Sequence, residues 1–155
     1  MTTIVVETRI LAPIEACFDL ARDVDAHVKT SSTTGERAVG GRTSGLLELG
    51  DVVTFEAVHF GIRQRLTSKI VEFDRPNCFV DEMVEGAFAS LRHTHEFFVE
   101  GTSILMRDTL TWRSPLGPLG VIADKLFVKR HLYRFMVAKQ SDLKVHAERT
   151  RGRAG

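Results

Sequence analysis

The chain has 155 residues, of which 43% are hydrophobic and 26% charged, and its formal net charge is +1. This length and composition suit a single domain with a sizeable core, and a second domain is not expected. No run approaches the roughly 20 apolar residues of a membrane-spanning helix. The first residues also lack the basic start and long apolar core of a signal peptide, so we expect a cytoplasmic protein.

The first third of the chain predicts a strand, two short helices and a connection. Residues 2–11 alternate apolar and polar side chains, which is typical of a strand. Pro13 suits the first turn of a helix, and apolar residues then recur at helical spacing. We expect a second short helix over Asp23–Lys29. Residues 30–50 are rich in Thr, Ser and Gly, and they predict a short strand near Glu36–Val39 before a mobile connection.

From Asp51 onward the sequence predicts a meander of strands and a terminal helix. Strands are expected at residues 52–60, 62–73 and 78–85, because turn signals separate them, and a hairpin follows over Phe88–Arg113. A long helix then runs to about Val145, roughly 40 Å in length, which is enough to cross the sheet. Its expected inward contacts are Ile122, Leu126, Tyr133, Val137 and Leu143. We assign the domain to residues 1–147 and expect a basic, disordered tail at 148–155.

The hairpin is the most informative segment, because its pattern puts titratable groups on an apolar face. With Glu100 and Gly101 as the central turn residues, His93 lies opposite Asp108. The same face collects Ala89, Leu91, His93, His95, Phe97, Ile104, Met106, Asp108, Leu110 and Trp112. A one-residue slip would bury charged side chains, so the choice of face is well specified. Polar groups within an apolar lining are typical of a ligand pocket.

The chain also carries a set of short motifs. They are Phe79-Val80-Asp81-Glu82-Met83, Gly86-Ala87-Phe88, His93-Thr94-His95-Glu96-Phe97, Gly101-Thr102, Met106-Arg107-Asp108 and Pro115-Leu116-Gly117-Pro118-Leu119-Gly120. Together they resemble the bacterial branch of the SRPBCC superfamily, which includes START lipid-transfer domains, plant pollen-allergen ligand carriers and polyketide cyclase/dehydrases. The resemblance covers nearly the whole chain.

This resemblance implies an α+β helix-grip fold. In that fold a curved antiparallel sheet of about seven strands wraps around a long C-terminal helix, and two short helices follow the first strand. It also implies a deep pocket between sheet and helix for a hydrophobic ligand. One activity is not implied, because the same fold hosts carriers, sensors and enzymes.

We therefore predict that the protein binds a small hydrophobic or amphipathic molecule, as a carrier or a sensor, between the sheet and the C-terminal helix. The residues expected to contact this ligand are Glu56, Gln64, Leu66, Leu91, His93, His95, Phe97, Met106, Asp108, Leu110, Trp112, Ile122, Leu126 and Tyr133.

Two alternative functions stay open. The pocket could perform cyclase- or dehydrase-like acid–base chemistry, with His93 as a base oriented by Asp108 and His95 as a donor that polarises a carbonyl. The segment 118–155 holds nine Lys or Arg against three Asp or Glu, so it could instead bind a regulatory partner or an anionic membrane surface. Few aromatic side chains accompany these charges, and we expect no nucleic acid to bind.

Metal binding is a weaker reading of the same residues. His93, His95 and Asp108 make a two-histidine, one-carboxylate set of the kind that zinc and iron sites use. We nevertheless expect no metal and no cofactor, because SRPBCC proteins are not generally metal proteins. Cys17 and Cys78 lack metal-type spacing and are expected to be ordinary buried thiols. The sequence carries no prediction of oligomeric state.

Overall fold

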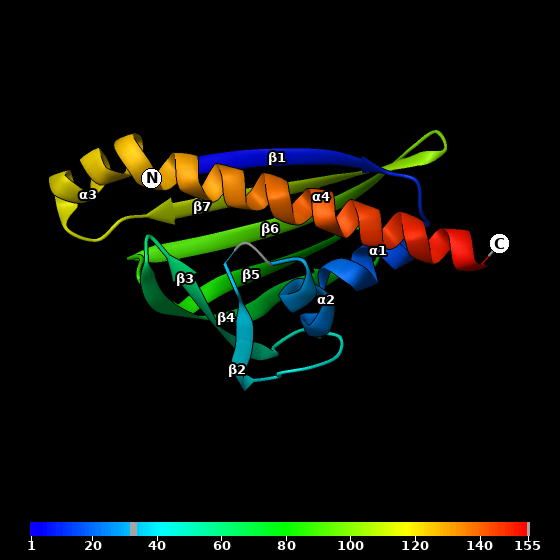
Figure 1. Ribbon diagram of the computed structural model, residues 1–155, viewed down its shortest axis with the longest axis horizontal. Helices are drawn as coiled ribbons and strands as arrows, with labels where there is room; N and C mark the ends of the chain where they lie inside the picture. Colours follow the sequence, from blue (N-terminus) through cyan, green and yellow to red (C-terminus); the bar gives the residue numbers. More distant parts are fainter. Residues whose placement is uncertain (32–33, 155) are drawn as a thin grey trace.

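The computed structural model describes residues 1–31 and 34–154, and it consists of one curved antiparallel sheet, short helices and a long C-terminal helix (Figure 1). The strands are β1 (Thr2–Ile10), β2 (Arg37–Gly41), β3 (Val52–His59), β4 (Ile62–Asp74), β5 (Cys78–Glu85), β6 (Ser90–Glu100) and β7 (Ser103–Arg113). The helices are α1 (Ile14–Ala21), α2 (Val24–Lys29), α3 (Gly117–Ala123), the π-helical turn η1 (Asp124–Val128) and α4 (Lys129–Ala154).

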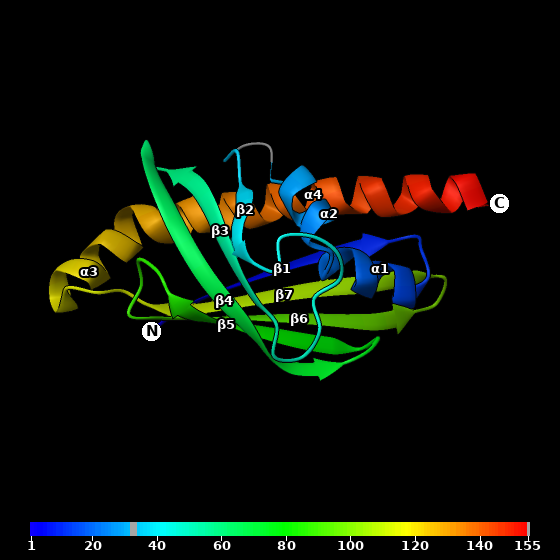
Figure 2. The ribbon, with the colours of Figure 1, turned by 90° about the horizontal axis from the view of Figure 1, so that it is seen from below.

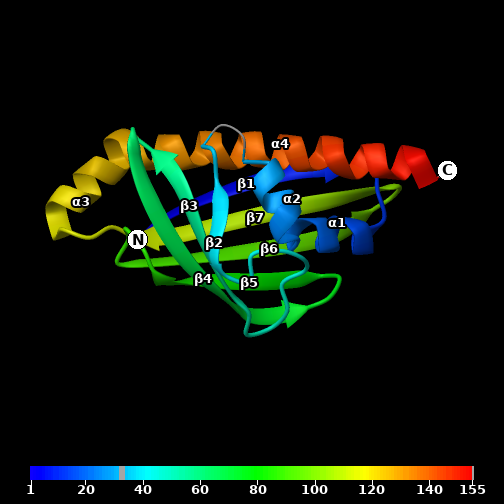
Figure 3. The ribbon, with the colours of Figure 1, turned by 60° about the horizontal axis from the view of Figure 1, so that its bottom comes forward.

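The seven strands lie in the order β1-β7-β6-β5-β4-β3-β2, so the meander is continuous and β1 closes the sheet against β7. Helix α4 runs along the sheet beside β1, while β2, β3 and β4 curve up on the other side (Figures 1 and 2). Helices α1 and α2 cover one end of the concave face (Figure 3). This arrangement confirms the predicted helix-grip fold.

Local sequence accounts for both short helices. Pro13 directly precedes α1 as its N-cap residue, one position earlier than the first helical turn. Asp23 caps α2, because its carboxylate accepts hydrogen bonds from the backbone N–H groups of Asp25 and Ala26. The predicted strand near Glu36–Val39 is β2, displaced by one to two residues.

The hairpin register differs from the prediction by two residues. The central turn residues are Gly101 and Thr102, so that Glu100 pairs with Ser103. Gly101 has a φ of +61°, which suits glycine at the first central position of a type II′ turn. A shift of two residues keeps every side chain on its predicted face but changes its partner. His95 therefore lies opposite Asp108, and His93 opposite Leu110.

The end of the chain also differs from the prediction, because α4 continues to Ala154 where a disordered tail was expected from residue 148. Two contacts hold this last stretch against the end of β1: the Leu11 backbone N–H donates to Glu148 at 3.0 Å, and Arg151 donates to the Leu11 carbonyl at 3.1 Å. Residues 32–33 of the predicted mobile connection and Gly155 of the predicted tail lie outside the described residues. Over the two described ranges, no helix is long and apolar enough to span a membrane.

Phe18 of α1 anchors the larger of two apolar clusters in the core. Its ring is fully buried and meets the rings of Phe73, Phe79 and Phe97 edge-on, at centroid distances of 5.3 to 5.6 Å. Cys17 is buried beside it as a free thiol, and burial raises its pKa to about 11. Cys78 is also free and is half-buried.

Replacing Phe18 should test how much of the fold depends on this cluster. Phe18→Ala should lower the free energy of unfolding by about 3–5 kcal/mol, because it removes a fully buried ring and leaves a cavity among three other rings. Phe127→Ala is the matched control: Phe127 is 63% exposed, so its loss should change the stability by less than about 0.5 kcal/mol. Urea unfolding monitored by circular dichroism measures both values, and equal effects would contradict the assignment of the core.

Candidate functional site

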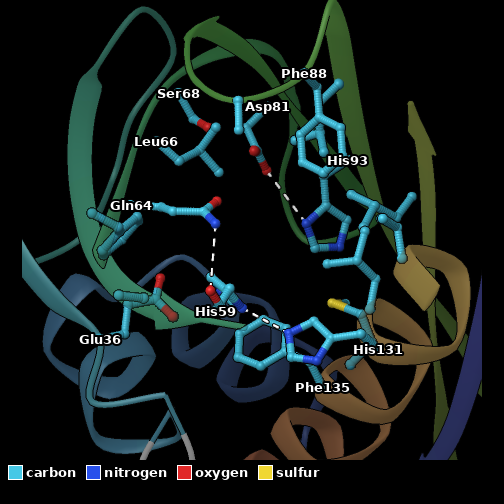
Figure 4. A pocket seen from close by; sticks show the side chains of 18 of the residues that line it. Glu36, His59, Gln64, Leu66, Ser68, Asp81, Phe88, His93, His131 and Phe135 are labelled. Atoms are coloured by element: carbon cyan, nitrogen blue, oxygen red, sulfur yellow. Dashed lines mark hydrogen bonds and ion pairs between the residues drawn. The ribbon is translucent and has the colours of Figure 1, made fainter. Parts of the chain in front are cut away.

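A cavity of about 390 Å³ lies between the inner face of the sheet and the helices α3, η1 and α4 (Figure 4). This volume is in the range of sites that enclose small organic molecules. Most of its wall is apolar; examples are Phe55, Leu66, Phe88, Leu91, Leu110 and Phe135. Polar side chains are gathered at a few places in that wall, and each of these places has a distinct arrangement.

The first is a group of four side chains on β5, β6 and β7, here called the Asp–His cluster: Asp81, His93, His95 and Asp108. Asp81 Oδ2 lies 3.0 Å from His95 Nε2 and 4.0 Å from His93 Nδ1. The other nitrogens of the same two rings face Asp108 Oδ1, at 2.8 Å for His95 Nδ1 and 3.5 Å for His93 Nε2. The two rings thus lie between two carboxylates, with their centroids 3.8 Å apart.

The carboxylates and histidines of the Asp–His cluster change one another's pKa values. Burial on its own lowers the pKa of His95, but the attraction of Asp108 and the hydrogen bonds to Asp108 and Asp81 outweigh burial and raise this pKa to about 9. Burial opposes ionisation of Asp108, yet His95 and His93 hold the pKa of this carboxyl well below its usual range. The side chain of His95 is therefore a charged hydrogen-bond donor at neutral pH.

Helix α4 supports the cluster from behind. The amide of the fully buried Gln140 donates to Asp108 Oδ2 at 2.6 Å and to the Val6 carbonyl at 3.0 Å. Its oxygen accepts from Thr8 Oγ1 at 2.5 Å. One side chain of the helix thus fixes the position of Asp108 and binds β1 at two points.

A second polar group, here called the Glu36 cluster, comprises Glu36, His27, Ser31 and Lys139. His27 Nε2 lies 2.6 Å from Glu36 Oε1, and the Lys139 ammonium donates to Ser31 Oγ at 2.9 Å and lies 3.9 Å from Glu36 Oε2. Burial lowers the pKa of Lys139, and it also lowers the pKa of His27. Burial opposes ionisation of Glu36, but the charges of His27 and Lys139 outweigh burial and hold the pKa of this carboxyl well below its usual range.

A histidine pair joins the β3–β4 hairpin to α4. His59 Nδ1 lies 2.8 Å from His131 Nε2, and the ring of Phe60 packs on His131 at 4.3 Å (Figure 4 shows the two histidines). Burial lowers the pKa of both histidines, and in His59 the neighbouring His131 lowers it further. Phe60 and Leu116 line the cavity and are 55% and 78% exposed, so the cavity reaches the surface beside this pair.

The structure brings many of the predicted ligand-contacting residues to the cavity. Those that line it are Gln64, Leu66, Leu91, His93, His95 and Leu110. Phe97, Met106, Asp108 and Trp112 are buried on the predicted face but lie behind the cavity wall. The indole of Trp112 donates to Asp124 at 3.1 Å, which ties the sheet to η1.

The prediction that Glu56 contacts the ligand is wrong, because its side chain points away from the cavity. Glu56 lies on the outer face of β3, where its carboxylate meets Arg37 at 2.7 Å and Arg65 at 3.0 Å. The alternation along β3 sends its neighbours Phe55 and Ala57 into the cavity instead.

The inward direction predicted for four helix residues is also wrong. Their side chains are between 41% and 61% exposed; they are Ile122, Leu126, Tyr133 and Val137. Only Leu143 of the expected inward contacts is buried. The positions that face the sheet recur every four residues; they are Gly120, Asp124, Val128, Leu132, Met136 and Gln140. The π-helical turn makes this spacing compatible with one face, because it accommodates an additional residue per turn.

Sequence reasoning missed several polar residues of the cavity wall: His27, Glu36, His59, His131 and Lys139. Asp81 is a further polar residue of the wall that was not among the residues expected to contact the ligand. Asp81 lies on the same face of β5 as Phe79, and both line the cavity. Lys139 had a readable signal as well, since it lies three residues after Met136 on the buried stripe of α4.

The Glu36 cluster predicts how stability changes in acid. Because the folded-state pKa of Glu36 lies below the ordinary value of about 4.3, its contribution is present above that pH and is lost as the pH falls through the folded-state pKa. Between about pH 5 and about pH 3, the melting temperature of the wild type should fall more steeply than that of Glu36→Gln. The exposed Glu85 provides the control, and Glu85→Gln should keep the wild-type slope. Equal slopes in all three proteins would contradict the assignment.

Comparison with known proteins extends the result for the fold. No protein-family model and no curated protein matches the sequence. Among solved structures, TTHA0849 from Thermus thermophilus has a TM-score of 0.77 at 21% identity, over 94% of this chain and 97% of that chain. Major latex-like protein 151 from Panax ginseng has a TM-score of 0.70 at 16% identity, again over 94% and 97%.

Protein CV1439 from Chromobacterium violaceum has a TM-score of 0.73 at 12% identity, over 94% of this chain and 96% of that chain. At these identities the likeness establishes a shared fold and says nothing of activity. The chain shares its helix-grip fold with these three proteins over nearly its whole length.

Proposed function

We propose that the protein binds a small hydrophobic or amphipathic molecule inside the cavity, as a carrier or a sensor. The observation that carries the proposal is the cavity itself, whose wall is apolar except at a few defined polar groups. Transfer of an apolar ligand from water into such a space is favourable, and the polar groups set its orientation.

The positions of the polar groups favour a ligand with an apolar body and hydrogen-bonding substituents. His93 and His95 offer ring nitrogens from the sheet, and Lys139 offers an ammonium from α4. Gln64 contributes an amide from β4, which points toward the same space (Figure 4). His95 and Lys139 already lie against carboxylates of the protein, so a purely apolar ligand leaves these two side chains paired, whereas Nε2 of His93 is buried without a hydrogen-bond partner among the described residues.

Acid–base catalysis by His93 and Asp108 has less support. A base and the group that orients it need to be within about 2.6–3.2 Å of each other. His93 Nε2 lies 3.5 Å from Asp108, and the shorter contact belongs to His95. The basic surface of α4 also has less support than the cavity, because Lys139 is buried and Lys144 pairs with Glu148 at 2.9 Å. A cytoplasmic location stays a prediction.

Narrowing the cavity should weaken ligand binding. An apolar fluorescent probe should bind the wild type and be displaced by lipophilic small molecules, while Ala57→Leu should reduce its affinity several-fold, because Ala57 lines the cavity. Val58→Leu is the matched control: Val58 is the next residue of β3, is 46% exposed and lies on the outer face, so the affinity should not change.

Fluorescence titration gives these affinities, and thermal melts show that both variants are folded. Native mass spectrometry of freshly purified protein then identifies any molecule that the cavity retains. A wild type that takes up no probe, or equal affinities in Ala57→Leu and Val58→Leu, would contradict the proposal.

A further inference from the structure

The members of the Asp–His cluster differ in whether they reach the cavity, and the ligand-binding proposal makes no use of this difference. Asp81, His93 and His95 line the cavity, whereas Asp108 lies behind the two histidines and does not. Each histidine turns one nitrogen toward Asp81 and the other toward Asp108. The two carboxylates therefore have different relations to the cavity, although both contact the same two rings.

The geometry points to a divalent metal site, of the zinc type, in which Asp81, His93 and His95 are the ligands and Asp108 orients both histidines from behind. One donor atom from each of the three ligands can be chosen so that all lie within 4.8 Å of one another. A tetrahedral zinc ion with bonds of 2.0–2.1 Å separates its donor atoms by about 3.3 Å. The separations of 3.0 Å and 4.0 Å from Asp81 Oδ2 lie on either side of that value.

The role of Asp108 distinguishes this arrangement from a simple ion-pair cluster. Histidines that bind metals usually donate their second N–H to a carboxylate, which fixes the tautomer and the direction of the ring. Asp108 Oδ1 lies 2.8 Å from His95 Nδ1 and 3.5 Å from His93 Nε2, so a single carboxylate faces the second nitrogen of both rings. Gln140 in turn holds the other oxygen of Asp108, which makes the support rigid.

Charge and access fit a cation as well. Asp81 and Asp108 place two carboxylates beside the histidines in a region where the four side chains are 7–17% exposed, and a dication bound there is attracted by both. Three protein ligands leave a fourth position for water or another ligand, and all three residues line the cavity. The sequence favoured no metal and offered His93, His95 and Asp108 only as a weaker set; in the proposed site Asp81 takes the place of Asp108.

Cobalt binding tests the site directly, and it does not depend on any organic ligand in the cavity. The chain without an affinity tag is treated with a chelator and titrated with Co²⁺ and, separately, with Zn²⁺. We expect one ion per chain, with the intense visible absorption of tetrahedral Co²⁺, and displacement of Co²⁺ by Zn²⁺. Asp81→Asn and His93→Gln should abolish this spectrum, and Asp108→Asn should weaken binding about 10–100-fold.

Two control variants separate this site from the other histidines. His131→Gln removes one member of the His59–His131 pair, and His146→Gln removes an exposed histidine of α4; both should keep the spectrum and the affinity. The wild-type titration alone decides the matter if a cluster variant does not fold. Absence of one-to-one binding to the wild type, an octahedral spectrum typical of aqueous Co²⁺, or loss of binding in His131→Gln would overturn the inference.

Discussion

The buried carboxylate of Asp108 is the group on which the arrangement of the site depends. It is buried at the middle of β7, the strand beside the edge strand β1, and an ionised group there is costly unless hydrogen bonds and opposite charge surround it. His95 supplies the charge, and Gln140 supplies a hydrogen bond from α4. The same amide also reaches β1, so the need to solvate one carboxylate fixes the helix against two strands.

Much of the fold was readable from the sequence because its main signals are periodic. Alternation with a period of two fixes which face of a strand is buried, and that assignment survives a register error of two residues. The exact pairing does not survive it, since a pairing depends on one local turn. The choice between Glu100-Gly101 and Gly101-Thr102 shifted the partner of Asp108 from His93 to His95.

For the C-terminal helix the sequence predicted the element but not the face that is buried. In a helix of constant pitch, residues four apart drift around the axis by about 40°, so a buried stripe cannot keep that spacing for five steps. The π-helical turn at 124–128 offsets part of this drift, and the residue types of that segment do not predict a π-helical turn. Apolar residues such as Leu126 and Tyr133 were natural choices for the inner face, yet Asp124 and Gln140 occupy it because Trp112 and Asp108 need polar partners there.

The polar groups that sequence reasoning missed come from separate elements that meet only in the folded chain. Glu36 precedes β2, His27 lies on α2 and Lys139 on α4, and nothing in their local sequence links them. Their meeting has a consequence for recognition, because the Glu36 cluster and the Asp–His cluster both contribute to the wall of one apolar cavity. Within each cluster carboxylates lie against basic side chains, so an apolar occupant leaves these contacts in place. Selectivity can then arise from where an occupant places its polar atoms, while the apolar wall between the clusters supplies the free energy of transfer from water.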